Sequence, residues 1–210
     1  MFSNSAHLSG SPWDDLWCMI RTMERRTALR SLAAVPLAAS AAAGATSGWS
    51  NAFAERLRDD FLVHWRSTKD YTLAVLEAMP AREFGFQPAA GQFTFAEQLE
   101  HIGLANNAYF SSFATDVKRE NVEGPPPRSQ AALRRYLNAS FDYGTEVLGA
   151  LTEEDFSRRD ISFVPSTHTA QDLFLRGYMH SAHHRGQLVV YLRLKGITPP
   201  PWVFSPTGIE

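Results

Sequence analysis

The pattern of apolar and polar positions after residue 50 predicts four long amphipathic helices. Their expected ranges are residues 51–79, 94–116, 129–151 and 169–195. Within each range, apolar side chains recur at intervals of three and four residues, which gathers them on one helix face. Helix breakers at Pro80, residues 124–127 and Gly196 separate or end these ranges. No segment alternates with period two for long enough to indicate a strand. We therefore expect an all-α four-helix bundle over residues 50–201, followed by a tail at 202–210.

Local signals indicate where the helices begin. Thr94 and Glu97 form a capping box, in which two side chains satisfy free backbone N–H groups at the start of the second helix. Ser129 is the expected N-cap of the third helix. Residues 152–155 indicate one further short turn, and residues 157–168 are expected to be irregular. The longer loops allow a connection that is not simply up-down-up-down.

The composition is that of an ordinary soluble globular protein. The chain has 210 residues, of which 44% are hydrophobic and 20% charged, and its formal net charge is −2. Lys and Arg do not form a basic stripe, so we expect no nucleic-acid partner. No segment is long and apolar enough for a mature membrane span. Cys18 is the only cysteine, so a transition-metal site must be built from His, Asp and Glu.

The first fifty residues are typical of a targeting sequence. Residues 23–46 combine a charged start, an apolar Ala/Leu-rich middle and small residues at the end. The pair Arg25 and Arg26 just before that run resembles a twin-arginine export signal. We therefore expect a cleaved signal peptide and a periplasmic protein. The alternative is an Ala-rich helix that is retained in a cytoplasmic protein. Residues 1–22 fit neither role, and we interpret them as a mis-assigned upstream region with Met23 as the true start.

Two of the seven histidines lie four residues apart on the fourth expected helix. His180 and His184 therefore project from one face, which is the apolar, core-facing stripe. A His-x-x-x-His segment supplies two ligands to zinc and related ions, although this spacing also arises by chance. His183 lies about a hundred degrees around the helix from His184, so the two cannot easily share one ion. We expect His183 to lie behind the ligands or on the surface.

The other histidines give weaker signals. His101 lies on the flank of the apolar stripe of the second helix. Spacing alone leaves open whether it is a ligand or a partly buried histidine that is hydrogen-bonded to a neighbour. His64 is expected to be an edge residue beside Trp65. His168 is expected to cap the fourth helix or to be solvated.

Three separated segments resemble the DinB superfamily in order and spacing. Residues 98–102, Gln-Leu-Glu-His-Ile, resemble the Gln-Leu-x-His-Ile segment of that family's second helix. Residues 180–188, His-Ser-Ala-His-His-Arg-Gly-Gln-Leu, resemble its fourth-helix signature together with residues 191–196. Further matches lie at residues 77–80, 86–88 and 196–200. The resemblance covers roughly residues 52–201.

The resemblance implies a four-helix bundle with a divalent metal near one end. In the family, the ligands are one histidine of the second helix and two histidines four apart on the fourth. These correspond to His101, His180 and His184 of this sequence. The position of His183 is often not histidine in family members, in agreement with the helix geometry. Many members are cytoplasmic, so the expected export signal is a departure from the family.

Three protein ligands leave at least one coordination position open, which favours a reactive metal over a purely structural one. Nitrogen ligands suit Zn or Ni, with Fe or Cu as alternatives. The metal would lower the pKa of a bound water for hydrolysis, or bind the thiol of a small-molecule substrate as thiolate. The family's thiol transferases and isomerases imply the second. The alternative is a non-enzymatic, stress-related module whose ion holds two helices together.

Other polar residues give no clear catalytic group. No general base is obvious, because Glu97 is better explained by the cap. Asn106, Asn107 and Arg185 are expected to be solvated helix faces, with a pocket lining as the alternative. The family commonly forms homodimers. Three phenylalanines could form such an interface, and core packing explains them equally well: Phe110, Phe113 and Phe141.

Overall fold

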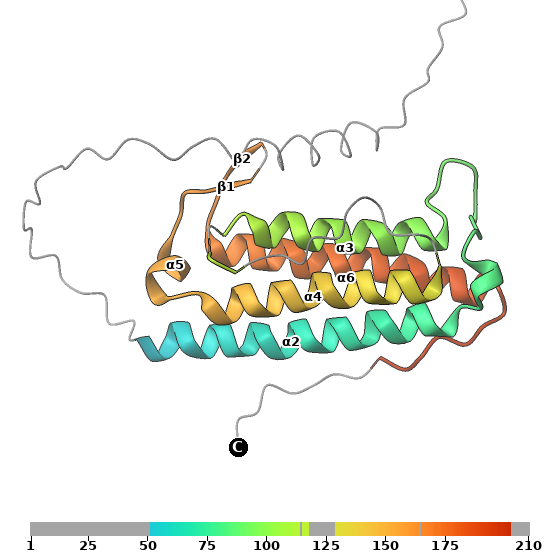
Figure 1. The fold of residues 1–210 in the computed structure, drawn as a ribbon, viewed down its shortest axis with the longest axis horizontal. Helices are drawn as coiled ribbons and strands as arrows, with labels where there is room; N and C mark the ends of the chain where they lie inside the picture. The colour runs from blue at the N-terminus through green and yellow to red at the C-terminus, as the bar shows by residue number, and fades with distance from the viewer. Residues whose placement is uncertain (1–50, 114, 118–128, 164, 203–210) are drawn as a thin grey trace, which may run out of the picture. The chain divides into compact units, whose positions relative to one another are not determined.

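The computed structural model describes residues 51–113, 115–117, 129–163 and 165–202. Its four long helices are α2 (Asn51–Ala78), α3 (Phe95–Ser111), α4 (Gln130–Ala150) and α6 (Ala170–Leu194). Each of α4 and α6 packs against both α2 and α3, which closes a four-helix bundle (Figure 1). The predicted all-α fold is confirmed. The expected signal, the region before it and residues 203–210 of the expected tail lie outside the described residues.

The direction of the helices differs from a simple up-down-up-down bundle. The colours of Figure 1 show α3 and α4 running in one direction, and α2 and α6 in the other. Side-chain positions agree, since Gly103 faces Tyr136 and, further along both helices, Asn106 bonds Ser140. Parallel neighbours need a connection long enough to return along the bundle, and residues 112–129 provide that length. None of the described helices is long and apolar enough to cross a membrane.

The helix boundaries agree with the predicted ones to within a residue, except at the end of α3. Residues 112–116 are expected to be helical, but α3 ends at Ser111. The hydroxyls of Ser111 and Ser112 both donate to the carbonyl oxygen of Ala108, at 3.1 Å each. They occupy the acceptor that the amide of Ser112 would use in a continuing helix. The apolar position of Phe113 therefore extends the hydrophobic pattern beyond the helix itself.

The sequence led us to expect that residues 157–168 are irregular, and this prediction is wrong for the residues that form a hairpin. After the short helix α5 (Glu153–Ser157), strand β1 (Ile161–Phe163) pairs antiparallel with β2 (Ser166–His168). Each strand has three residues, too few for an alternating pattern to be visible in the sequence. A capping box begins α5, in agreement with the short turn that was predicted. The hairpin leads directly into α6.

The interior of the bundle is rich in aromatic side chains. The indole N–H of Trp65 on α2 donates to the carbonyl oxygen of Phe141 on α4 at 2.9 Å. The Trp65 ring lies 4.8 Å from the rings of both Phe110 and Phe141. A Cβ at Gly144 would lie 2.7 Å from the Phe110 ring, so the absence of a side chain allows this close approach. Phe110, Phe113 and Phe141 are all core residues, and the dimer-interface alternative is wrong for them.

Candidate metal centre

The start of α3 is fixed by the capping box that the sequence predicts. Thr94 Oγ1 accepts a hydrogen bond from the Glu97 amide at 3.2 Å, and the Glu97 carboxylate accepts one from the Thr94 amide at 2.8 Å. Glu97 therefore acts as a cap, as expected. Gln98 and His101, three residues apart on α3, both reach side chains of α6.

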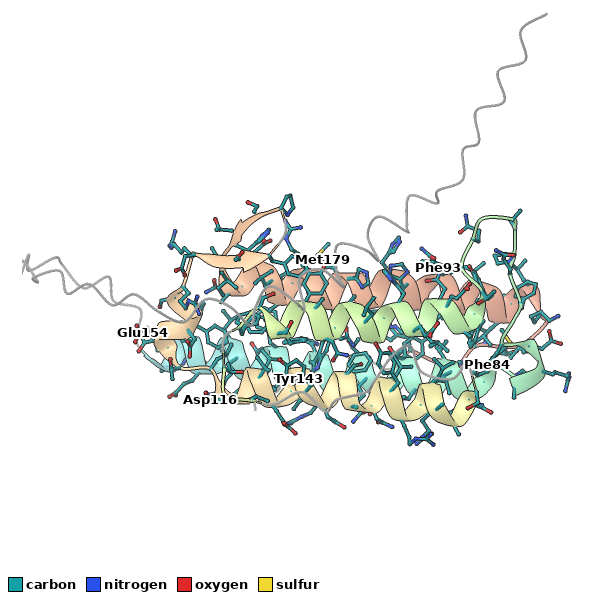
Figure 2. The ribbon with its side chains drawn as sticks, turned by 45° about the horizontal axis from the view of Figure 1, so that its top comes forward. Phe84, Phe93, Asp116, Tyr143, Glu154 and Met179 are labelled. Carbon is teal, nitrogen blue, oxygen red and sulfur yellow. The ribbon has the colours of Figure 1, made fainter. Side chains whose placement is uncertain are left out.

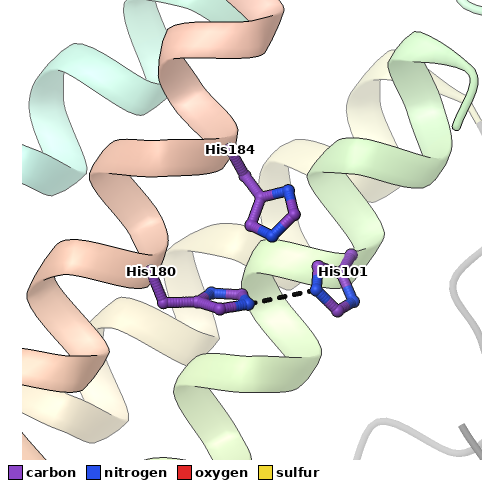
Figure 3. Close-up of side chains that lie close together, drawn as sticks. All are labelled: His101, His180 and His184. Carbon is purple, nitrogen blue, oxygen red and sulfur yellow. Dashed lines mark hydrogen bonds between the residues drawn. The ribbon is translucent and has the colours of Figure 1, made fainter. Parts of the chain in front are cut away.

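Helix α6 supplies the other two histidines of the site. His180 and His184 lie four residues apart near the middle of the helix and project toward α3. Figure 3 shows their rings beside that of His101, with ring centroids 4.5 to 4.9 Å apart. One nitrogen of each ring lies within 4.8 Å of the others, and the described residues hold no other such group of three. The cluster lies in mid-helix, so the expected position near one end of the bundle is wrong.

The spacing of the rings suits a small divalent cation. Nε2 of His101 lies 3.0 Å from Nε2 of His180. Two imidazoles that bind zinc tetrahedrally at about 2.0–2.1 Å have their nitrogens about 3.3 Å apart. The two distances differ by a few tenths of an ångström, so small side-chain shifts would bring this pair to the ligand geometry, and the His184 donor lies within 4.8 Å of both.

Burial keeps the three imidazoles uncharged. Desolvation lowers the pKa of His101 from 6.5 to about 4. It lowers the pKa of His180 to about 3 and that of His184 to about 2, with a further contribution from the neighbouring histidines. At neutral pH each ring is therefore neutral and has a nitrogen lone pair to offer a cation. The donor set fits a divalent transition metal.

The three rings differ in how their other nitrogen is satisfied. Nδ1 of His101 and Nδ1 of His180 are buried and have no hydrogen-bond partner in the described part of the chain. Nδ1 of His184, in contrast, lies 2.6 Å from Oε1 of Gln98. Because an amide oxygen can only accept, His184 carries its proton on Nδ1. Its Nε2 is then free to bind a cation.

Aromatic side chains line the histidine cluster. The Phe93 ring lies 5.4 Å from that of His101, and the Tyr109 ring lies 5.9 Å from that of His180. Tyr109 also stacks on Phe163 of β1 at 4.7 Å, which ties the hairpin to the site. Figure 2 shows Phe93 on the side of the bundle formed by α3 and α6. Apolar walls of this kind strengthen electrostatic interactions within a site.

Asn106, Asn107 and Arg185 are buried, so the expectation that they form solvated helix faces is wrong. Asn106 Oδ1 accepts a hydrogen bond from Ser181 Oγ on α6 at 2.9 Å, and its Nδ2 donates to Ser140 Oγ on α4 at 3.4 Å. The Arg185 guanidinium donates to a backbone carbonyl of α2 at 3.4 Å. These contacts join α6 to α3 and α2, and α3 to α4.

The remaining histidines lie outside the cluster. His183 is exposed, as the helix geometry predicts. His64 is half-buried and makes an edge-to-face ring contact with a tyrosine of α6. His168 Nδ1 lies 2.6 Å from the Asp172 carboxylate, and His168 Nε2 lies 3.2 Å from a carbonyl oxygen of β1. It therefore joins the hairpin to the start of α6, and it is neither solvated nor the helix cap.

Sequence reasoning assigned no role to Gln98 or Gln187, although both are hydrogen-bonded at the site. The available signal was their spacing. Gln98 lies three residues before His101, and Gln187 lies three residues after His184. Residues three apart on a helix lie on the same face, so this spacing could have predicted that both amides lie near the histidines.

Comparisons with known proteins agree with this architecture. The DinB superfamily profile matches residues 64–188. The protein YjoA of Bacillus subtilis strain 168 is 28% identical over 145 residues, which cover 66% of this chain and 91% of YjoA. A crystal structure of a DinB-like protein from Bacillus cereus ATCC 10987 is similar with a TM-score of 0.61 and 22% identity, covering 70% of this chain and 97% of its own. The crystal structure of YjoA gives a TM-score of 0.56 and 22% identity, covering 68% of this chain and 95% of its own.

Proposed function

We propose that this chain, which belongs to the DinB superfamily, binds a divalent metal ion through His101, His180 and His184. One observation carries the proposal: three neutral imidazoles from two helices converge, with one nitrogen of each within 4.8 Å of the others. Two ring nitrogens of the cluster are buried without a hydrogen-bond partner among the described residues, which costs stability and calls for an explanation. Metal binding supplies that explanation.

We further propose zinc or nickel as the ion, with iron or copper as alternatives. An all-imidazole donor set suits these metals and is a poor match for magnesium or calcium, which prefer oxygen ligands. Three protein ligands leave at least one position for another molecule, whereas structural zinc sites usually close all four. A cation held there would lower the pKa of a water or a thiol that occupies the open position.

The proposed activity is that of a metal-dependent thiol transferase or hydrolase acting on a small molecule. The residues around the histidines support a role in binding and in proton donation. Burial raises the pKa of the Tyr109 phenol, so it stays protonated at neutral pH and can donate a hydrogen bond. Phe93 offers apolar surface beside His101, and Phe163 offers it beside Tyr109. Turnover of a panel of small thiols, compared between wild type and His184→Ala, tests this assignment.

A non-enzymatic module, in which the ion holds two helices together, is the alternative. Thermal melting with and without metal separates the two. The ligands come from α3 and α6 alone, and these helices already pack on a hydrophobic core that all four helices share. We therefore expect the metal-free protein to stay folded. Collapse of the fold on metal removal, with no substrate-dependent activity after metal is restored, would favour the structural module.

Titration of the metal-free protein with Zn²⁺ or Ni²⁺ tests the ligand assignment. We expect saturable binding in wild type and its loss in His184→Ala. His64→Ala is the matched control, because His64 is half-buried in the same bundle and lies outside the cluster. Equal binding by wild type and His184→Ala would contradict the assignment.

We propose that residues 23–46 are a twin-arginine export signal, that residues 50–201 form the DinB-like domain, and that the mature protein is periplasmic. The pair of arginines before an Ala/Leu-rich run supports this, as do the small residues before the cleavage points that follow Ala43 or Ala45. Mass spectrometry of the exported protein gives its N-terminus directly. A mature chain that still contains Cys18 would contradict both the signal and the proposed start at Met23.

We propose that the protein forms a homodimer. We also propose that it has no nucleic-acid partner. Four large apolar side chains on α6 are exposed, and their spacing places them along the length of the helix: Leu175, Met179, Val190 and Leu194. Exposed apolar surface of this kind favours association. The net charge of −2 gives no electrostatic basis for binding DNA. Sedimentation analysis and a gel-shift assay at low salt test the two statements separately.

A further inference from the structure

Four polar side chains form a continuous hydrogen-bonded chain from the metal centre to the protein surface. His184 Nδ1 lies 2.6 Å from Gln98 Oε1, and Gln98 Nε2 lies 2.5 Å from Gln187 Oε1. Gln187 Nε2 in turn lies 2.8 Å from Nε2 of His183. Gln98 belongs to α3 and the other three residues belong to α6, so the chain crosses the helix interface twice.

The direction of one hydrogen bond in this series fixes the direction of the others. A primary amide has one accepting oxygen and one donating nitrogen, so both glutamines pass the same polarity along the chain. Gln187 donates to Nε2 of His183, Gln98 donates to Gln187, and His184 donates from Nδ1 to Gln98. The opposite polarity would place a donor against Nδ1 of His184. Its proton would then move to Nε2, and the lone pair that faces the cluster would be lost.

His184 is the only histidine of the cluster that is oriented in this way. The corresponding nitrogens of His101 and His180 have no partner in the part of the chain that the structure describes. Gln98 is 1% exposed, so water does not compete for its hydrogen bonds. The other end of the hydrogen-bonded series reaches solvent, because His183 is exposed. The exposed histidine next to the ligand pair thus has a contact that the helix geometry alone did not suggest.

We propose that Gln98, Gln187 and His183 are positioning residues that hold His184 in the Nδ1–H tautomer and so keep its Nε2 ready to bind the metal. None of the three binds the ion. This inference rests on the proposed metal-binding function. Partners of this kind typically change metal affinity about 10- to 100-fold when they are removed. The alternative is that the glutamines join α3 to α6 without affecting His184.

Two readouts test the proposal. The first is the tautomer of His184 in the metal-free protein, measured by nitrogen NMR of the imidazole rings. The second is Zn²⁺ affinity, measured by competition with a chelator, together with the visible absorption of the Co²⁺-loaded protein. Gln98→Met removes the acceptor while keeping the length of the side chain, and Gln98→Glu restores an accepting oxygen. Gln187→Met tests the second link from a less buried position.

We expect Gln98→Met to lower Zn²⁺ affinity about 10- to 100-fold, to shift the Co²⁺ spectrum and to mix the tautomers of His184. We expect Gln98→Glu to recover most of the affinity, and Gln187→Met to show a smaller loss. If Gln98→Met fails to fold, Gln187→Met carries the test. Unchanged tautomer and affinity in the folded variants would overturn the proposal, even if their melting temperatures fall. Absence of Zn²⁺ binding by wild type would instead overturn the proposed function, while the NMR readout would still decide the tautomer.

Discussion

The interface between α2 and α4 and the interface between α3 and α6 belong to the same bundle and are built from different chemistry. The buried part of the first is apolar, with Trp65 packed on Phe141 and the indole N–H donating to the Phe141 carbonyl oxygen. Its charged groups lie at the exposed edge, where Lys69 pairs with Asp142 and Glu77 with Arg134. The second holds three histidines, two glutamines and the Asn106–Ser181 hydrogen bond. It also contains two buried nitrogens without a partner in the described residues. The packing of the first interface stabilises the fold. The second interface brings possible metal ligands together, and its unpartnered buried nitrogens lower stability.

This difference predicts that the two interfaces respond differently to substitution. Changes on the α2–α4 side should alter the free energy of unfolding and leave metal binding per folded molecule intact. Changes at the histidines and glutamines of the α3–α6 side should lower metal affinity more than they lower the free energy of unfolding at neutral pH. The following predictions, in order of decreasing effect on stability, test that separation.

Phe141→Ala should destabilise the protein by about 3–5 kcal/mol, because it removes a fully buried ring and leaves a cavity against Trp65. Urea denaturation measures the loss. Zn²⁺ bound per folded molecule should not change. A folded Phe141→Ala protein that has lost metal binding would show that the two interfaces are not separable.

Acidification should destabilise the metal-free protein from about pH 6.5 downward. Burial lowers the pKa of His101 to about 4, and those of His180 and His184 to lower values, so the unfolded chain takes up protons first. This contribution to stability is complete above the histidine pKa of the unfolded chain, about 6.5. It is lost as the pH falls toward the lower pKa values of the folded protein. The slope is up to about 1.4 kcal/mol per pH unit for each histidine.

Urea denaturation between pH 7.5 and pH 5 measures that slope. A variant with alanine at His101, His180 and His184 should lack most of it. Bound metal should reduce the loss until protons displace the ion. Identical slopes for wild type and the triple variant would contradict the assignment of the buried neutral rings.

Gly144→Ala should cost about 1–3 kcal/mol, because its Cβ would lie 2.7 Å from Phe110 and 2.9 Å from Trp65 in a filled core. Gly177→Ala on α6 is the matched control. Its Cβ would meet Tyr109 at 3.7 Å, an ordinary contact, so the higher helix propensity of alanine should leave stability unchanged or raised by up to about 1 kcal/mol. Similar losses in both variants would mean that the α3–α6 side is packed as tightly as the core.

Ser181→Ala should cost about 1 kcal/mol, because it removes the donor to the buried Asn106 Oδ1. Metal affinity should change little, since the Ser181 hydroxyl donates to Asn106 and not to a histidine of the cluster. A loss of affinity as large as that of a ligand variant would show that this hydrogen bond positions His180. Thermal melting and Zn²⁺ competition on the same sample give both values.

Most of the fold could be predicted from the sequence because its signals are local. Apolar spacing and capping residues predicted four helices to within a residue at all but one boundary. The end of α3 was missed because Ser111 and Ser112 compete for one carbonyl, which apolar periodicity does not report. The hairpin was missed because its strands are three residues long.

The site could be predicted only in part for a different physical reason. The pair His180 and His184 follows from helical spacing, but His101 lies 79 residues from His180 in the chain, and only the family resemblance joined them. The burial of Asn106 and Arg185 depends on how helices pack, which the sequence of one helix does not specify. Polar residues at such positions look like surface residues until the neighbouring helix is in place.

X-ray absorption spectroscopy of the Zn²⁺-loaded protein tests the central claim most directly, because it reports the number and type of atoms around the ion. We predict three imidazole nitrogens at about 2.0–2.1 Å and at least one further light atom. The His184→Ala variant should show one imidazole fewer or no bound zinc. A zinc shell with no imidazole scattering, or a spectrum unchanged by His184→Ala, would contradict the three-histidine centre.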